Sequence, residues 1–234
     1  FLSMINKSFN IPQWAAWAPG LNTPAQWRQW AAKPELPSEK ADIKTPSIPA
    51  ISRRRCSKLA KISIELASQA TTTINPDYSI FCSQHGDLSS TEKLMADICQ
   101  QQPLSPTQFT QSVHNSAVGL YTILNKQQSN STFISAGKNT FKMALIEALA
   151  WLNQYENNRV LLVMAETYFP DLYKDLGISP EHEYGVAFVL DNHTAEAPSF
   201  TEDDLLVSHN NMALPPALGF LAWLLQHSNN QASV

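Results

Sequence analysis

Residues 159–165 read RVLLVMA, and every position after Arg159 is apolar. A run this short and uniform predicts a strand that is buried on both faces of a sheet. Residues 184–190, YGVAFVL, form a second run of the same kind. A β-prone segment (131–136) and a segment with helical periodicity (139–152) precede the first run. Strands that alternate with helices in this way are typical of an α/β fold.

The remaining segments extend the same pattern. The sequence predicts further strands at 9–17 and 78–83, and helices that follow Thr23-Pro24 and cover 54–70, 91–99 and 115–124. We therefore expect a mixed, mainly parallel sheet with helices on both faces. The whole chain, 1–234, is expected to form one domain with its core at about 9–190. Residues 191–234 are expected to be a short C-terminal extension with a helix.

Composition narrows the functional classes. The net charge of −4 argues against nucleic-acid binding, and no apolar run reaches the roughly 18 residues that a transmembrane helix requires. The three cysteines, at 56, 82 and 99, are odd in number and lack metal-ligand spacing. We expect reduced thiols in a cytoplasmic protein that binds neither a metal nor a cofactor.

Two polar clusters leave alternatives open. Ser83-Gln84-His85-Gly86-Asp87 is expected to form a turn after a strand, with Asp87 capping the next segment, although Ser83 and His85 also allow a hydrolase or acyltransferase. Ser112 and His114 allow the same enzymatic reading. His114 and Asn115 are otherwise expected to be a buried, hydrogen-bonded pair or to line a cavity for an acyl chain.

A basic run, Arg53-Arg54-Arg55 with Lys58 and Lys61, has two interpretations. It could form structural ion pairs at the start of a helix. It could also be a docking surface for an acidic carrier protein or for phosphate.

Several of these segments together resemble the N-terminal half of a β-ketoacyl synthase, which has a thiolase-type fold. The resemblance is carried, in order, by the arginine run and the helix after it, by 81–87, 105–109, 112–119 and 160–166. It is especially similar to the synthase-like subunits of bacterial aryl polyene gene clusters. The resemblance implies a thiolase-like half-fold, because too few residues follow 190 for a second half.

The resemblance also implies where a nucleophile would stand. In complete synthases a cysteine at a helix N-terminus accepts the acyl chain, because the helix dipole and backbone donors lower the pKa of its thiol. An ungapped count places Lys138 at this position, and a slip of one residue places Gly137 there. Neither residue can form a thioester. The histidines of a complete synthase would belong to the missing half.

These departures imply a chain length factor, a non-catalytic subunit that forms a heterodimer with an active β-ketoacyl synthase. Acyl groups linked to phosphopantetheine would reach the partner on an acyl carrier protein. A subunit that only stabilises the partner remains an alternative. The implied acyl-tunnel and interface residues are Gln108, Phe109, Ser112, His114, Asn115, Ser131, Thr132, Phe133, Ile134, Ser135 and Ala136.

Overall fold

The computed structural model describes residues 8–36, 40–176, 182–193, 199–206 and 214–231. Its strands are β1 (Phe9–Trp17), β2 (Tyr78–Cys82), β3 (Asn130–Ile134), β4 (Arg159–Glu166), β5 (Tyr184–Asp191) and β6 (Ser199–Phe200). Its α-helices are α1 (Pro24–Ala32), α2 (Ala50–Arg53), α3 (Lys58–Ala70), α4 (Leu88–Cys99), α5 (Pro106–Ser112), α6 (Ser116–Leu124), α7 (Thr140–Gln154), α8 (Glu202–Leu206) and α9 (Pro216–Gln231). Two 3-10 helices are η1 (Gly137–Asn139) and η2 (Asp171–Leu176).

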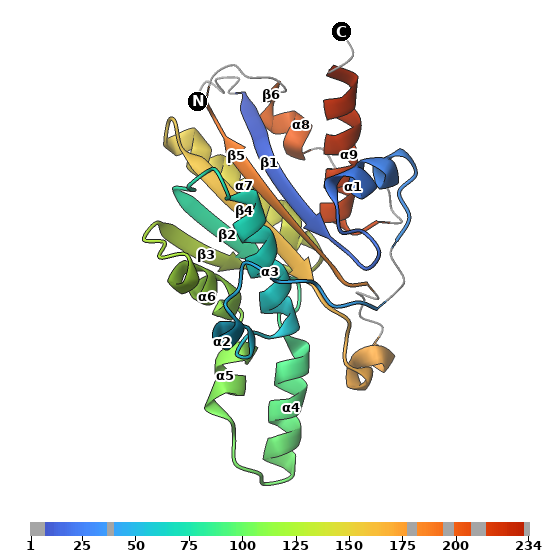
Figure 1. The fold of residues 1–234 in the computed structure, drawn as a ribbon, viewed down its shortest axis with the longest axis vertical. Helices are drawn as coiled ribbons and strands as arrows, with labels where there is room; N and C mark the ends of the chain where they lie inside the picture. The colour runs from blue at the N-terminus through green and yellow to red at the C-terminus, as the bar shows by residue number, and fades with distance from the viewer. Residues whose placement is uncertain (1–7, 37–39, 177–181, 194–198, 207–213, 232–234) are drawn as a thin grey trace.

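The described strands form one sheet in the order β3-β2-β4-β5-β1-β6 (Figure 1). β2 is parallel to both β3 and β4, whereas the β4–β5, β5–β1 and β1–β6 pairs are antiparallel. The expected mixed sheet of an α/β fold is confirmed, and three of its five described strand pairs are antiparallel. Parallel pairing needs a long crossover, usually a helix, and β4 returns to β5 without a crossover α-helix among the described residues.

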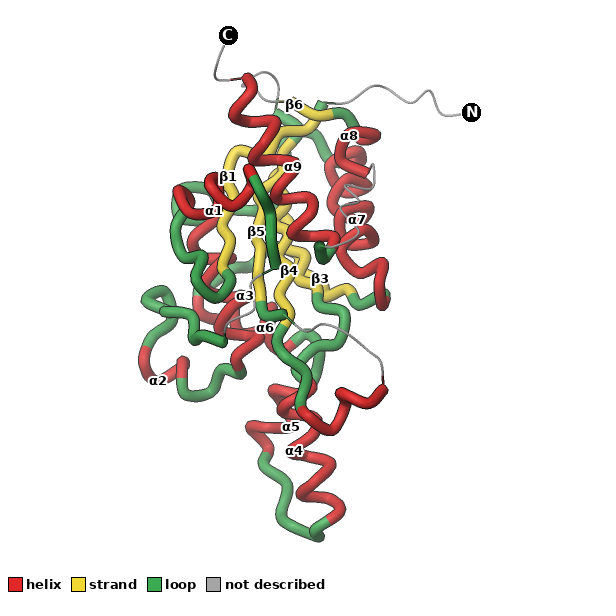
Figure 2. Tube along the Cα trace, turned by 90° about the vertical axis from the view of Figure 1, so that its right-hand side faces the viewer, coloured by secondary structure: helices red, strands yellow, loops and turns green. Residues whose placement is uncertain are grey.

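Both faces of the sheet are covered (Figures 1 and 2). One face packs against α1, α7 and α9, and the other packs against α3 and α6. Alternate residues of β4 contribute to the two sides: Leu162 lies in the first core and Leu161 in the second, and both are fully buried. The continuous apolar run of this strand is thus explained, since both of its faces contact helices.

The hydrophobic core extends beyond 190. Phe200, Leu205 and the buried face of α9, including Phe220, pack against the sheet. The Phe220 ring lies 5.1 Å from that of Phe188 on β5, in an edge-to-face arrangement. The C-terminal segment therefore completes one of the two layers instead of extending from the core.

Capping residues set the helix boundaries. Thr23 and Gln26 form a capping box at α1, and the Ser57 side chain accepts a hydrogen bond from the backbone N–H of Ala60 at α3. The second helix was expected to begin at Arg54, but Ser57 starts it at Lys58, so the arginine run lies in α2 and the turn after it. Asp87 caps α4 as expected, through the backbone N–H of Ser90.

A helical arm projects from the body. α4 and α5 pack against each other and extend beyond the end of the sheet in both views (Figures 1 and 2). α5 was not expected as a separate helix. Its sequence, PTQFTQS, is short and polar and carries no apolar periodicity, but Ser105 caps it through the backbone N–H of Gln108.

Candidate functional site

The described sheet has two edge strands, the two-residue β6 and the longer β3, and β3 is the open edge considered as a site. Its only partner among the described strands is β2, and its five residues are exposed or half-buried. Exposed apolar side chains lie on the helices at both faces beside this strand: Ile123 of α6 is 73% exposed, and Met143 and Ile146 of α7 are 36% and 38% exposed. Unpaired strand edges and apolar surface are features that proteins cover through association. This edge is therefore a candidate protein interface.

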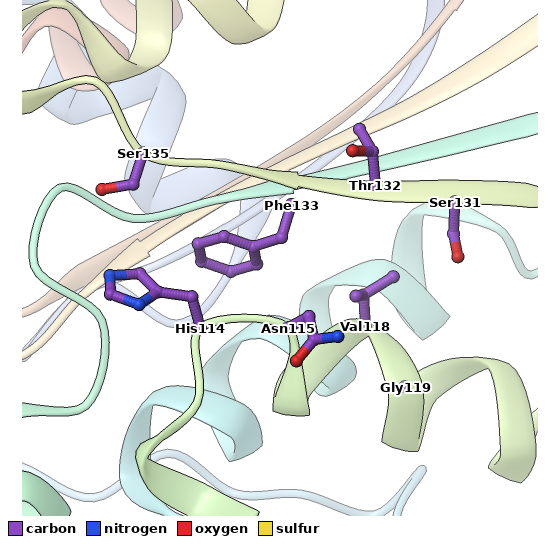
Figure 3. Close-up of a pocket in the computed structure, with 8 residues that line it drawn as sticks. All are labelled: His114, Asn115, Val118, Gly119, Ser131, Thr132, Phe133 and Ser135. Carbon is purple, nitrogen blue, oxygen red and sulfur yellow. The ribbon is translucent and has the colours of Figure 1, made fainter.

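A pocket of about 650 Å³ opens between β3 and the start of α6. Figure 3 shows the lining residues, with the ring of His114 beside that of Phe133. The two ring centroids are 5.6 Å apart, at an interplanar angle of 70°. The lining consists of His114, Asn115, Val118, Gly119, Ser131, Thr132, Phe133 and Ser135.

The pocket brings together six of the residues expected at a tunnel or interface. Val118 and Gly119 join them, and sequence reasoning did not single them out as pocket residues. His114 and Asn115 are exposed, so the expectation of a buried pair was wrong. They precede α6 at the open sheet edge, and the apolar neighbours that suggested burial, Ala117 and Val118, face the core instead.

Three other expected residues lie outside this pocket on α5. Phe109 is 62% exposed, Gln108 is half-buried, and the Ser112 hydroxyl donates to the backbone carbonyl of Phe109 at 2.9 Å. Ile134 and Ala136 are not part of the lining either. Ile134 packs against the first core, and Ala136 lies between β3 and η1.

A buried carboxylate bonds the turn after β2, which itself contacts two pocket residues. Glu166, at the end of β4, is 3% exposed and accepts hydrogen bonds from the backbone N–H of Gln84 and from the hydroxyl of Ser83. Burial raises the pKa of Glu166 from 4.5 to about 7, and these two hydrogen bonds oppose the rise. Sequence reasoning placed this residue at the end of a matching segment only. No local signal marked it, because a glutamate is rarely buried unless it is paired, and its partners here are distant in the sequence.

The serine–histidine alternatives are not supported by the geometry. Ser83 is 1% exposed, and its hydroxyl is held between the Glu166 carboxylate and the backbone N–H of Gly86, at 3.1 and 2.9 Å. His85 stacks edge-on against Phe169, at 4.7 Å between centroids. The Ser112 hydroxyl is bonded to its own helix. A nucleophile must reach a substrate, and both hydroxyls have structural partners instead.

The position that the sequence resemblance implies for a nucleophile lies in η1, directly before α7. Lys138 and Gly137 are exposed there, and Gly137 has a φ of +58°, which favours glycine. Thr140 closes this turn: its hydroxyl accepts from the backbone N–H of Ala136 and donates to the Gly137 carbonyl. The three cysteines lie elsewhere, with Cys56 and Cys82 buried and Cys99 exposed at the end of α4.

The basic run is partly structural. Lys58 forms ion pairs with Glu183 at 2.7 Å and with Asp42 at 3.4 Å, and the Arg53 guanidinium donates to the Ile48 carbonyl. Arg54 and Arg55 are exposed. In the described part of the chain, no cluster of three or more His, Cys, Asp or Glu side chains could hold a metal ion. Its helices are also too short or too polar to cross a bilayer.

Solved structures similar to this chain are ketosynthase assemblies. The structure of the ketosynthase ApeO in complex with its chain length factor ApeC, from Xenorhabdus doucetiae, matches with 28% identity and a TM-score of 0.79. That match covers 94% of this chain and 92% of the other, so the two chains are close in length.

Two more distant structures share the fold. The ishigamide ketosynthase/chain length factor matches with 15% identity and a TM-score of 0.63, over 82% of this chain and 64% of the other. A type II polyketide acyl-carrier protein in complex with its hexaketide-bound ketosynthase matches with 13% identity and a TM-score of 0.62, over 81% of this chain and 64% of the other. This chain thus spans less than two thirds of the length of these two relatives.

Among curated proteins, none matches this chain. The family model of the β-ketoacyl synthase N-terminal domain matches residues 27–233, nearly the whole chain. The thiolase-like fold and the resemblance noted in the sequence are thereby confirmed. The chain belongs to the β-ketoacyl synthase N-terminal domain family.

Proposed function

We propose that this chain is a non-catalytic chain length factor, which pairs through the β3 edge with a complete β-ketoacyl synthase subunit. The observation that carries the proposal is the open edge itself. β3 offers unpaired backbone groups, and Ile123, Met143 and Ile146 add apolar surface from the helices on both sides of the sheet. Such a composite of edge and apolar side chains suits a permanent interface, which buries more than about 2,000 Å².

The proposed lack of catalysis rests on the residues at the nucleophile position. In a complete synthase, acyl transfer needs a thiolate at the start of the helix that follows the strand equivalent to β3. The resemblance puts Lys138 or Gly137 at that position, and neither residue can carry a thioester. In this proposal the partner supplies the cysteine and the histidines. The acyl carrier protein delivers its phosphopantetheine-linked substrate to the partner.

The position of the pocket supports a role in shaping the acyl tunnel. It opens beside β3, so a subunit bound at this edge would lie next to His114, Thr132 and Phe133. Phe133 and Val118 provide apolar contact for an acyl chain, while the exposed His114 limits the space at one side. The names of similar structures support the same assignment, since two of them are ketosynthase and chain length factor assemblies.

Co-expression with a complete β-ketoacyl synthase tests the proposal. A stoichiometric complex should co-purify, and hydrogen exchange at the amides of β3 should slow in it. Condensing activity with an acyl thioester should require the partner. Activity of this chain alone would instead favour the enzyme alternative. Unaltered product lengths after substitutions in the pocket of an intact complex would leave only a stabilising scaffold.

A further inference from the structure

The turn between β2 and α4 connects a buried acid to the pocket. The Glu166 carboxylate accepts hydrogen bonds from two groups of this turn, the backbone N–H of Gln84 and the hydroxyl of Ser83. The same Ser83 oxygen accepts from the backbone N–H of Gly86, at 2.9 Å. The acid thus fixes both ends of residues 83–86, directly at one end and through the serine at the other.

Two pocket residues rest on this turn. His114 lies against Gly86 so closely that an added Cβ would be 3.1 Å from two atoms of the ring. Ser135, just beyond β3, donates from its hydroxyl to the carbonyl of Gln84 at 2.9 Å. The backbone N–H of Ser83 also donates to the carbonyl of Ile134, at 3.4 Å. A displacement of the turn would therefore move two pocket residues, His114 just before α6 and Ser135 just after β3.

We infer that Glu166 is a positioning residue of the pocket, which sets the places of His114 and Ser135 through the 83–86 turn. The hydrogen-bonding pattern gives the reason. A carboxylate accepts from several donors, and it meets two donors of the turn in a space that water does not reach. An apolar residue here would leave the Gln84 N–H and the Ser83 hydroxyl without these acceptors. The inference rests on the proposed function only in giving the pocket a role in product length.

Three variants test the inference. Glu166→Met keeps a similar length but removes both acceptors, whereas Glu166→Gln keeps one oxygen for the Gln84 N–H and can donate to Ser83. Ser83→Ala removes the link to Gly86. Glu65→Met is the matched control, because Glu65 is also buried but accepts from Ser47 and Gln69, neither of which belongs to the turn. Amide exchange and NOE contacts are measured by NMR in the complex and in the chain alone.

The expected pattern is specific. In Glu166→Met the protection of the Gln84 amide should fall roughly tenfold, and the NOE between the His114 and Phe133 rings should weaken. Ser83→Ala should lower the protection of Gly86 by a similar factor. Glu166→Gln should restore the pocket contacts, and Glu65→Met should leave them unchanged.

Unchanged protection and an unchanged ring contact in Glu166→Met would overturn the inference. The turn and the pocket belong to one chain, so amide protection and the ring contact can be measured whether or not a partner binds. Failure of the wild-type chain to bind a synthase would count against the proposed function alone.

Discussion

The imidazole ring of His114 lies against Gly86, so that a Cβ at this glycine would be 3.1 Å from both Cδ2 and Nε2 of the ring. Gly86 also has a φ of +67°, which costs a residue with a side chain about 1–2 kcal/mol. Gly86→Ala should therefore destabilise the protein by this amount plus a steric term. Adding His114→Ala should recover the steric term only. A double-mutant cycle by urea denaturation measures this coupling, and purely additive effects would contradict it.

Glu166 should make stability depend on pH in the neutral range. Its pKa is about 7 in the folded chain and 4.5 when exposed, because burial penalises its charged form. A folded pKa above the unfolded value gives a contribution that is complete below about pH 4.5 and is lost as pH rises through 7. The difference between these two pKa values corresponds to about 3 kcal/mol in the free energy of unfolding.

The free energy of unfolding should accordingly fall between pH 5 and pH 8 by up to about 3 kcal/mol more in the wild type than in Glu166→Gln. Urea denaturation at matched protein concentration, over this pH series, measures the difference. Parallel curves for the two proteins would show that Glu166 is ionised in the fold at all these values.

Gly119 offers a way to fill the pocket. It lines the pocket within α6, and a Cβ added there would meet nothing within 4 Å. Gly119→Phe should shorten the products of the assembled complex, because a bulky side chain excludes the end of a rigid acyl chain. Gly119→Ala is the control: it should stabilise the helix by up to about 1 kcal/mol and change product length little.

The two α5 positions give a comparison for this series. By resemblance, Phe109→Ala should lengthen products and Ser112→Trp should shorten them, although both residues lie outside the pocket of the isolated chain. Mass spectrometry of products from complexes that still assemble provides the measurement. A shift at Gly119 with none at α5 would place the tunnel end at the pocket, and no shift at any of the three would contradict a role in chain length.

Restoring a thiol at the nucleophile position should not restore catalysis. Lys138→Cys places a cysteine in η1 before α7, and the proposed function assigns the catalytic histidines to the partner. The variant alone should fail to extend an acyl thioester in a condensation assay. Labelling with a thiol reagent is the control that the new cysteine is accessible. If this variant extended an acyl thioester without a partner, the proposal that the chain cannot catalyse condensation alone would be refuted.

Local sequence patterns predicted the strands that are buried on both faces. The runs around Leu162 and Phe188 are apolar at every position because helices cover both faces of these strands, and this left no doubt about their burial. The direction of each strand was harder to predict from the sequence. The antiparallel pairing of β4 with β5 is a long-range relationship, and the apolar pattern of the two runs is the same for either direction.

The sequence predicted most of the residues that line the pocket, but it did not predict how exposed they are. The family resemblance selected His114 and Phe133, and the structure brings them together. It could not show that His114 is exposed, because exposure there depends on β3 being the edge of the sheet, a property of the whole topology. Glu166 was missed as a site residue for a related reason: its partners, Ser83 and Gln84, are about 80 residues away in the sequence.

The most direct test of the account concerns the β3 edge as the surface that binds a synthase. Ile123→Asp places a charge beside this edge. Leu172→Asp is the control, since Leu172 is 61% exposed and belongs to η2, a segment that lies apart from β3 (Figure 1). Sedimentation velocity with the co-expressed synthase should show a one-to-one complex for the wild type and for Leu172→Asp. Ile123→Asp should weaken binding by about 2 kcal/mol or more, roughly thirtyfold. Equal binding by both variants, or a wild-type chain that stays monomeric beside the synthase at micromolar concentration, would contradict the account.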